Sequence, residues 1–389
     1  MDTNITKQRR FNWKYYINYF VIVGAMLLFV ILSTAGIVPN STLALLEEIL
    51  MNIILAVSLS LVVGFLGELS LGHAGFMCLG AYFGGLISML LDRADLVEGK
   101  SILSFLIALV VGAVVAGIFG FIIGLPALRL RGDYLAIVTL AFCEIVKTLL
   151  TNFTFKLDGE EYGGPIGIKT PKLPKTTLYI VGFVMLLITL AVIQNLIRSK
   201  HGRAITAIRD NEIAARATGI NVTKYKLLAF IVSAVFAGVA GVLYSFKYST
   251  VSASGFDYNY SIEILIMVVL GGMGNISGAM ISATLITFIN VKLQTLLTGP
   301  YAILKDVIYA IILVLIVIYN NAPKLKGFRE KYNLKALFAK ITSNKKRRGY
   351  ADDDGAWHRV PTKIEMNEVL STDLIVNESV KNPDKEDKS

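Results

Sequence analysis

Long apolar stretches separated by short polar turns run through most of the chain, and this pattern predicts membrane-spanning helices. A helix needs about 20 mostly apolar residues to cross roughly 30 Å of hydrocarbon. Stretches that approach this length cover residues 17–38, 43–66, 69–91, 102–125, 133–152, 177–197, 226–246, 260–275, 278–297 and 302–320. We therefore expect an all-α integral membrane protein with about ten transmembrane helices.

The stretch 260–275 is the weakest of these. Its strongly apolar part runs only from Ile262 to Leu270 and is followed at once by the sequence GGMGN. Backbone that leaves a helix at membrane depth is tolerated where protein surrounds it. A full crossing and a broken or re-entrant helix both remain open for this stretch.

Composition excludes a soluble globular domain. Hydrophobic residues make up 54% of the 389 residues and charged residues 17%, whereas soluble domains carry about 25% charged residues. The two cysteines, Cys78 and Cys143, lack CxxC spacing, and the histidines His73, His201 and His358 lie far apart in the sequence. Neither a zinc site nor a catalytic metal is predicted, and we expect no nucleic-acid partner.

Basic residues gather on one side of the predicted bundle. They occur in the segment 1–16, beside Arg129 and Arg131, in the loop 198–226 and in the region that begins at Lys324. Loops rich in lysine and arginine stay in the cytoplasm. We therefore expect both termini to be cytoplasmic.

The charge pattern also divides the chain into three parts. A cytoplasmic segment 1–16 precedes a transmembrane domain 17–320, and a polar tail 321–389 follows. The tail is basic as far as Arg348 and then acidic, a composition typical of disorder. We expect its basic half to lie against anionic membrane lipids, where each cation contributes about 1 kcal/mol.

The loop 198–226 carries the pattern of a short helix. Asp210 is a suitable N-cap and Gly219 a suitable left-handed stop, which frames a helix in the sequence NEIAARAT. Ile213, Ala217 and Ile220 would then share one face. On a neighbouring face, Glu212 and Arg216 have the spacing of an i, i+4 ion pair. A docking element and an ordinary solvated loop both fit this pattern.

Two glycine-rich segments share the pattern G-x-[L/M]-G-x-[L/I]-S, one beginning at Gly64 and the other at Gly271. Transporters built from internal repeats often line the substrate path with interrupted helices from corresponding positions of the two halves. The pathway candidates are Gly64, Gly67, Ser70, Gly72, Gly271, Gly274, Asn275 and Ser277. Close packing of helix backbones is the alternative reading of the same small residues.

Glu144 and Lys147 are ionisable residues inside an apolar stretch and stand at i and i+3. A charge at membrane depth costs on the order of 2.5–3.5 kcal/mol on insertion scales. Mutual pairing near the outer end of the fifth span is the structural reading, and a role in substrate binding or gating is the alternative.

Several sequence blocks together resemble the permease subunits of branched-chain amino-acid ABC importers, of the LivM type. The resemblance covers roughly residues 43–320. It is carried by GELSLGHAGFMCLGAY (Gly67 to Tyr82), PALRLRGDYLAIVTLAFCEIV (Pro126 to Val146), GGPIGI (Gly163 to Ile168), the block from His201 to Tyr244, and IEILIMVVLGGMGNISGAM (Ile262 to Met280).

The resemblance implies that the loop 198–226 is the cytoplasmic coupling element that the ATPase subunit grips. The residues that would carry this role are Arg209, Asp210, Glu212, Ala215, Arg216 and Gly219. It also implies a bacterial inner-membrane importer that contains a second permease, two ATPase subunits and an extracytoplasmic binding protein. The chain has no phosphate-binding loop of the form G-x-x-x-x-G-K-[S/T], so ATP is expected to be used by the partner subunits and no cofactor by this chain.

Three alternatives to this function stay open at the level of sequence. A permease of the same superfamily could carry urea, amides, sugars or nucleosides. A stand-alone carrier could be coupled to an ion gradient through Glu144 and Lys147. A membrane enzyme would need a polar catalytic cluster, and the sequence offers no His/Asp or Cys/His constellation for one.

Overall fold

The computed structural model describes residues 39–94, 102–130, 132–157, 160–248 and 250–296, together with single residues at 24, 308, 311 and 314. The chain divides into two units, 1–321 and 322–389, and all described residues belong to the first. The predicted spans 17–38 and 302–320 lie outside the described residues except for those single positions. The segment 1–16 and the predicted tail 321–389 lie outside them entirely.

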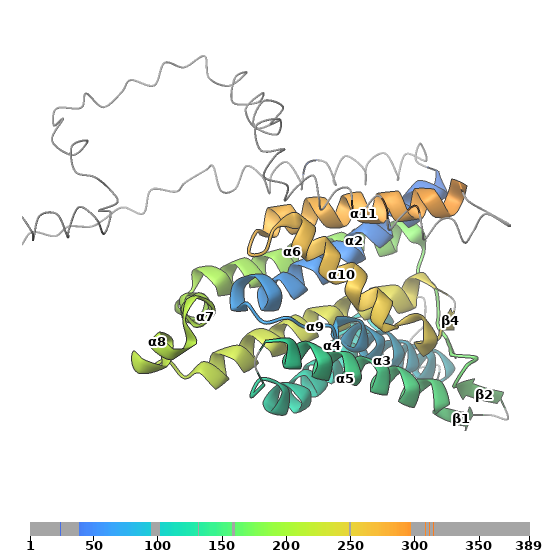
Figure 1. The fold of residues 1–389 in the computed structure, drawn as a ribbon. Helices are drawn as coiled ribbons and strands as arrows, with labels where there is room; N and C mark the ends of the chain where they lie inside the picture. Colours follow the sequence, from blue (N-terminus) through green and yellow to red (C-terminus); the bar gives the residue numbers. More distant parts are fainter. Residues whose placement is uncertain are drawn as a thin grey trace, which may run out of the picture. The chain divides into compact units, whose positions relative to one another are not determined.

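Seven helices in the described part are long and apolar enough to cross a membrane. They are α2 (Asn40–Ser60) with its continuation η1 (Leu61–Leu66), α3 (His73–Arg93), α4 (Ile102–Ala127), α5 (Asp133–Asn152), α6 (Lys175–Arg198), α9 (Val222–Lys247) and α11 (Ile276–Leu296). Each matches one of the predicted spans to within a few residues (Figure 1). The chain is a multi-pass membrane protein.

Helix α10 (Tyr258–Gly271) has 14 residues and falls short of a full crossing. At 1.5 Å per residue it is about 21 Å long. It ends where Gly272 and Gly274 adopt positive φ angles of 90° and 81°, which glycine tolerates because it has no Cβ. The helix therefore ends at Gly271, and its short length favours a broken helix over a full crossing of the stretch 260–275.

Helix α2 is the central element of the bundle. It packs against α6, α9, α10 and α11. Of its most apolar 18-residue stretch, 94% is buried within the protein. Its continuation η1 is a π-helix that ends at Gly67, where φ is 79°. Short π-helical turns are rare and often occur at functional sites.

Small residues allow α3, α4 and α9 to pack closely. A Cβ atom at Gly80 of α3 would lie 2.2 Å from the carbonyl oxygen of Gly238 of α9, so the two backbones are in direct contact there. Such contacts are typical of helix packing in membranes. The opposite face of α4 exposes apolar side chains, including Val110, Val114 and Ile118, as expected for contact with lipid.

Short strands connect the helices at one end of the bundle. β1 (Thr154–Leu157) pairs antiparallel with β2 (Glu160–Gly163), and β3 (Ile168–Lys169) pairs antiparallel with β4 (Thr250–Val251). A single 3₁₀ turn, η2 (Ala253–Gly255), precedes α10. Strands β1 to β3 lie in the segment 152–176, which links α5 to α6.

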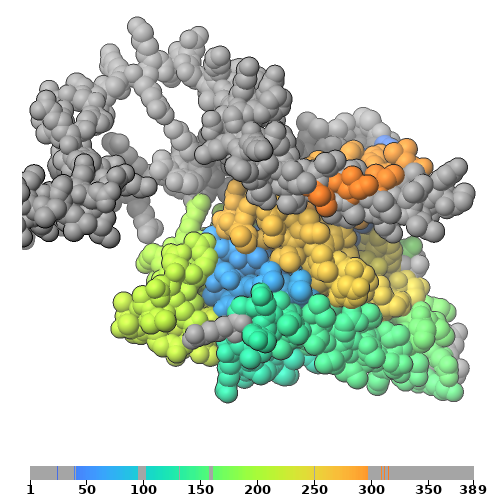
Figure 2. Space-filling view, in the orientation of Figure 1, coloured from blue at the N-terminus to red at the C-terminus, as the bar shows by residue number. Residues whose placement is uncertain are grey.

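Two short helices, α7 (Lys200–Asp210) and α8 (Glu212–Ala217), connect α6 to α9. Figure 1 shows α8 at the end of the bundle opposite to β1 and β2. In Figure 2 the same segment, in yellow-green, forms the surface at that end of the molecule. The basic loop 198–226 and the segment 152–176 are thus at opposite ends of the bundle.

Candidate functional site: the loop 198–226 and its charged cluster

The loop 198–226 begins with a capped helix. The Oγ of Ser199 accepts hydrogen bonds from the backbone N–H groups of His201 at 3.1 Å and Gly202 at 3.3 Å. These bonds satisfy two of the N–H groups that the first turn of α7 leaves without helical partners. Serine is a preferred residue at this position, so the start of α7 is encoded locally.

Helix α8 is capped by Asn211, and the predicted cap at Asp210 is wrong. The Oδ1 of Asn211 accepts a hydrogen bond from the backbone N–H of Ala214 at 3.0 Å. Asp210 is still the last residue of α7, and its carboxylate pairs with the Arg209 guanidinium at 3.2 Å. Because α7 continues to Asp210, the first residue with an extended backbone is Asn211. Asn211 is therefore the residue that can cap α8.

The predicted end of α8 at Gly219 is confirmed. Gly219 has a φ of 84°. The backbone N–H of Ile220 donates to the carbonyl of Ala215 at 3.1 Å, and that of Gly219 donates to Arg216 at 3.1 Å. This pair of bonds is the Schellman arrangement, which needs a left-handed residue. Both ends of α8 are therefore fixed by local hydrogen bonds.

The outer side of α8 carries apolar side chains, most of them small. Ile213 is 75% exposed, and Ala214 and Ala217 beside it are also exposed. Ala215 is buried against the bundle, and Ile220 is half-buried against its apolar core. Only Ile213 and Ala217 of the three-residue face predicted from the sequence are thus fully available at the surface.

A buried lysine links α8 to the bundle. The Lys226 side chain, in the second turn of α9, is only 4% exposed. Its Nζ forms an ion pair with Glu68 and a second one with Glu212 Oε2 at 3.2 Å. The other oxygen of Glu212 accepts from the Arg216 guanidinium at 2.9 Å, which confirms the predicted i, i+4 pair. Glu68, Glu212, Lys226 and Arg216 form what we call the charged cluster.

The pairing of Lys226 with Glu68 was not predicted from the sequence. The signal that could have found Lys226 is its position directly before the apolar run LLAFIVSAVF. A lysine that enters a buried span needs a carboxylate partner, and Glu68 stands in a glycine-rich motif at an equivalent depth.

Arg209 attaches the end of α7 to the two glycine-rich segments. Its Nη1 donates to the carbonyl of Gly64 at 3.0 Å, and a Cβ at Gly67 would lie 2.6 Å from the Arg209 Cγ. A Cβ at Gly64 would in turn lie 2.4 Å from the backbone nitrogen of Gly274. The two segments that share a pattern therefore touch each other, with the Arg209 side chain against both.

The non-helical segment 67–72 between η1 and α3 is held by side chains from other helices. The backbone N–H of Leu71 donates to Thr139 Oγ1 of α5 at 2.9 Å. Just beyond the segment, the backbone N–H of Ala74 donates to Ser261 Oγ of α10 at 3.0 Å. Irregular backbone at membrane depth requires such partners, since lipid offers none. The segment that carries Glu68 is thus part of the packed bundle.

The remaining pathway candidates lie at close backbone contacts or helix caps. A Cβ at Gly72 would lie 2.7 Å from the carbonyl of Thr139, and one at Gly271 would lie 2.4 Å from the nitrogen of Ala279. Asn275 Oδ1 accepts from the backbone N–H of Gly278 at 3.2 Å. Ser70 is buried and Ser277 is exposed. Packing accounts for the glycines, and a pathway role for these residues stays a prediction.

Glu144 and Lys147 form an ion pair at 2.7 Å. Glu144 Oε1 also accepts from the backbone N–H of Tyr258 at 3.2 Å, at the first residue of α10. A carboxylate at a helix N-terminus interacts favourably with the helix dipole. The structure thus gives this pair a role in joining α5 to α10.

A second set of polar side chains connects α2 with α9, α10 and α11. Lys247 pairs with Glu48 at 3.0 Å. The buried Asn52 donates to Thr287 Oγ1 at 2.9 Å and accepts from the Tyr260 hydroxyl at 3.2 Å. These residues were not singled out from the sequence, because isolated polar residues in apolar runs give no indication of their partners.

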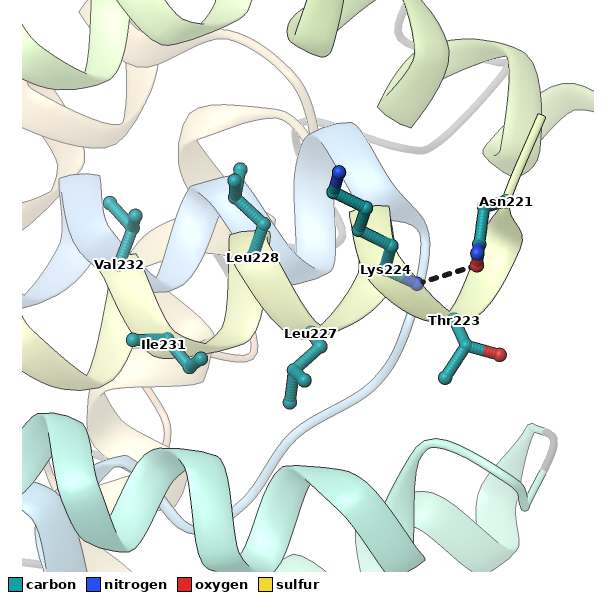
Figure 3. Close-up of a pocket in the computed structure, with 7 residues that line it drawn as sticks. All are labelled: Asn221, Thr223, Lys224, Leu227, Leu228, Ile231 and Val232. Carbon is teal, nitrogen blue, oxygen red and sulfur yellow. Dashed lines mark hydrogen bonds between the residues drawn. The ribbon is translucent and has the colours of Figure 1, made fainter.

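An open groove of about 540 Å³ runs along one side of α9 (Figure 3). Asn221, whose Oδ1 accepts from the Lys224 backbone N–H at 3.1 Å, and Lys224 itself lie at one end. Leu227, Leu228 and Ile231 line the rest. The groove has no convergent set of polar groups to orient a solute. Among the described residues, no three His, Cys, Asp or Glu side chains are placed to hold a metal ion.

Comparison with known sequences identifies a family. Residues 41–317 match the family described as "Branched-chain amino acid transport system / permease component". The chain is 37% identical to the LivM permease protein of the high-affinity branched-chain amino acid transport system of Salmonella typhimurium, over 60% of this chain and 59% of the relative. It is 36% identical to the corresponding LivM protein of Escherichia coli, over 64% and 63% of the two chains.

The chain is also similar, at 26% identity, to the ribose import permease protein RbsC of Escherichia coli, over 77% of this chain and 92% of the relative. The matched region of this chain spans about three fifths of the length of the two LivM relatives, 59% and 63%. No solved structure matches the chain.

Proposed function

Because the chain belongs to the family of branched-chain amino-acid transport permease components, we propose that it is the permease subunit of an ATP-driven importer of branched-chain amino acids. In this proposal the chain forms part of the path across a bacterial inner membrane, with both termini in the cytoplasm. A second permease, two ATPase subunits and an extracytoplasmic binding protein complete the importer. The chain itself catalyses no reaction and binds no cofactor, and ATP is used by the ATPase subunits.

The observation that carries the proposal is the construction of α8. This helix has only six residues, and isolated helices of that length are unstable in water. Here it is closed by Asn211 at one end and Gly219 at the other, and it is tied to α9 through Glu212 and Lys226. A helix held in this way can transmit force without unfolding.

The outer face of α8 suits insertion into a groove of another protein. Ile213 provides one large exposed apolar side chain, and the alanines at 214 and 217 allow a partner to approach the backbone closely. Helices commonly dock by placing such apolar anchors into a hydrophobic groove. We propose the ATPase subunit as the partner, and Ile213 as the residue at the centre of the contact.

The choice of a branched-chain amino acid as substrate rests on the relatives. Identity to the two LivM proteins is 37% and 36%, against 26% to the ribose permease. Other small solutes of the superfamily remain the alternative.

The experiment is uptake by the reconstituted complex. The chain, co-expressed with its second permease and ATPase subunits, is placed in liposomes that contain ATP, and binding protein with radiolabelled leucine is added outside. We expect uptake of leucine that stops when the ATPase subunit carries an inactivating substitution. Equal uptake without the ATPase subunits would instead indicate an ion-coupled carrier. ATP-dependent uptake of ribose or urea in place of leucine would refute only the assignment of the substrate.

A further inference from the structure

Lys226 lies where no local feature of its helix favours a cation. It is in the second turn of α9, near the helix N-terminus, where the helix dipole gives a cation no stabilisation. Its side chain is 4% exposed, so water stabilises the charge little. A buried charge persists when it is paired and hydrogen-bonded. The reason for Lys226 must therefore be found in its two carboxylate partners.

The two partners belong to different elements of the fold. Glu212 is the first residue of α8, and Glu68 lies in the non-helical segment between η1 and α3. Lys226 binds both at once. The Glu212 carboxylate is 22% exposed and directed inward, with Arg216 on its outer side. Glu212 is thus turned toward the bundle through Lys226.

A second attachment joins the same elements. Arg209, at the end of α7, donates to the carbonyl of Gly64 inside η1 at 3.0 Å. The α7–α8 segment is thus tied to η1 at Gly64 and to the segment just after it at Glu68. Two attachment points resist rotation as well as translation, whereas one would act as a pivot.

The segment 67–72 is well placed to pass a displacement onward. Thr139 of α5 accepts from Leu71 in the segment, and Ser261 of α10 accepts from Ala74 at the start of α3. Just before the segment, Gly64 of η1 packs directly on Gly274 at the break between α10 and α11. Coupling between sites travels through such contiguous hydrogen-bonded and packed contacts.

We propose that Lys226 is the positioning residue that transmits movement of α8 to the segment 67–72, and thereby links ATP use by the partner to rearrangement of the membrane helices. This inference rests on the proposed function, because it requires that α8 is moved by an ATPase subunit. Lys226 has no contact with substrate in this account. It acts through Glu212 on one side and Glu68 on the other.

The test separates coupling from assembly. Lys226→Met removes the charge and keeps a long side chain, and Lys224→Met is the matched control, because Lys224 is exposed on the same helix. In proteoliposomes of the whole importer we measure leucine uptake and ATP hydrolysis together. We expect Lys226→Met to retain ATPase activity and to lose at least about fivefold in solute carried per ATP, the lower range of coupling between sites. Lys224→Met should keep the wild-type ratio.

A second variant covers the case in which Lys226→Met fails to assemble. Glu68→Gln keeps the shape of the side chain and an oxygen that can accept from Lys226, so the fold is less affected. We expect it to lower the ratio of uptake to ATP use. Reaction of a thiol reagent with Leu71→Cys should change with nucleotide in the wild-type background and not in Glu68→Gln. Where Lys226→Met also assembles, the effects of the two substitutions should be less than additive.

The outcomes distinguish the two proposals. If either Lys226→Met or Glu68→Gln assembles and keeps the wild-type ratio of uptake to ATP use, the role of Lys226 is refuted. If the unmodified chain binds no ATPase subunit or shows no ATP-dependent uptake, the proposed function is refuted instead. A loss of uptake and ATPase activity in equal proportion in Glu68→Gln would assign the cluster to stability alone and overturn the inference.

Discussion

Truncation of the exposed side chain of α8 should weaken ATPase binding by a predictable amount. Complete burial of an isoleucine side chain contributes about 1.5–3 kcal/mol. Because 75% of Ile213 is exposed in the free chain, burial in a partner groove can recover about three quarters of that, or roughly 1–2 kcal/mol. Ile213→Ala should lose most of this contribution, which corresponds to about five- to thirtyfold weaker binding.

This substitution leaves the permease itself intact. Ile213 packs little against the rest of the chain, and alanine is a better helix former than isoleucine, so α8 should persist. Ile166 provides a matched control, because it is 62% exposed and lies in the segment 152–176 at the other end of the bundle. Ile166→Ala should leave ATPase binding unchanged.

The assay is titration of the purified permease in detergent with labelled ATPase subunit. The reasoning would be refuted by an unchanged dissociation constant for Ile213→Ala, provided that the control and the wild-type chain bind the subunit. A weakening of more than about a hundredfold would also contradict it, because apolar burial of one side chain does not supply so much energy.

Three further predictions concern the glycines and the intramembrane pair. Gly219→Ala has no steric conflict, but its φ of 84° should destabilise the end of α8 by about 1–2 kcal/mol, measurable as faster proteolysis of the loop 198–226. Gly80→Ala, whose Cβ would lie 2.2 Å from the Gly238 carbonyl, should lower the Tm in detergent, whereas Gly255→Ala, with open space around it, should not. Glu144→Gln should retain ATP-dependent uptake at every pH tested, and uptake abolished with assembly preserved would favour the ion-coupled alternative.

The transmembrane helices could be predicted because their signal is local. The length of each apolar run places a span directly, and the predicted stretches 102–125 and 133–152 lie within one or two residues of α4 and α5. The break after Leu270 was also visible, because consecutive glycines cannot sustain a helix at low cost. The strands β1 to β4 could not be predicted. β3 and β4, for example, have two residues each and exist only through their pairing with one another.

The site was only partly predictable for the same reason. The cap at Gly219 and the Glu212–Arg216 pair depend on residues a few positions apart, and both were found. The N-cap was misplaced by one residue because no local signal indicates that α7 continues to Asp210. The Lys226–Glu68 contact joins residues 158 positions apart, and only the folded chain brings these residues together.

Photo-crosslinking from position 213 tests the central claim most directly. Ile213 is replaced by a photoreactive phenylalanine analogue in the assembled importer, and Ile166 is replaced in the same way as the control. We expect irradiation to join the chain to the ATPase subunit from position 213 and not from position 166. An importer that takes up leucine with ATP, yet gives no crosslink to the ATPase subunit from position 213, would contradict the assignment of α8 as the coupling element.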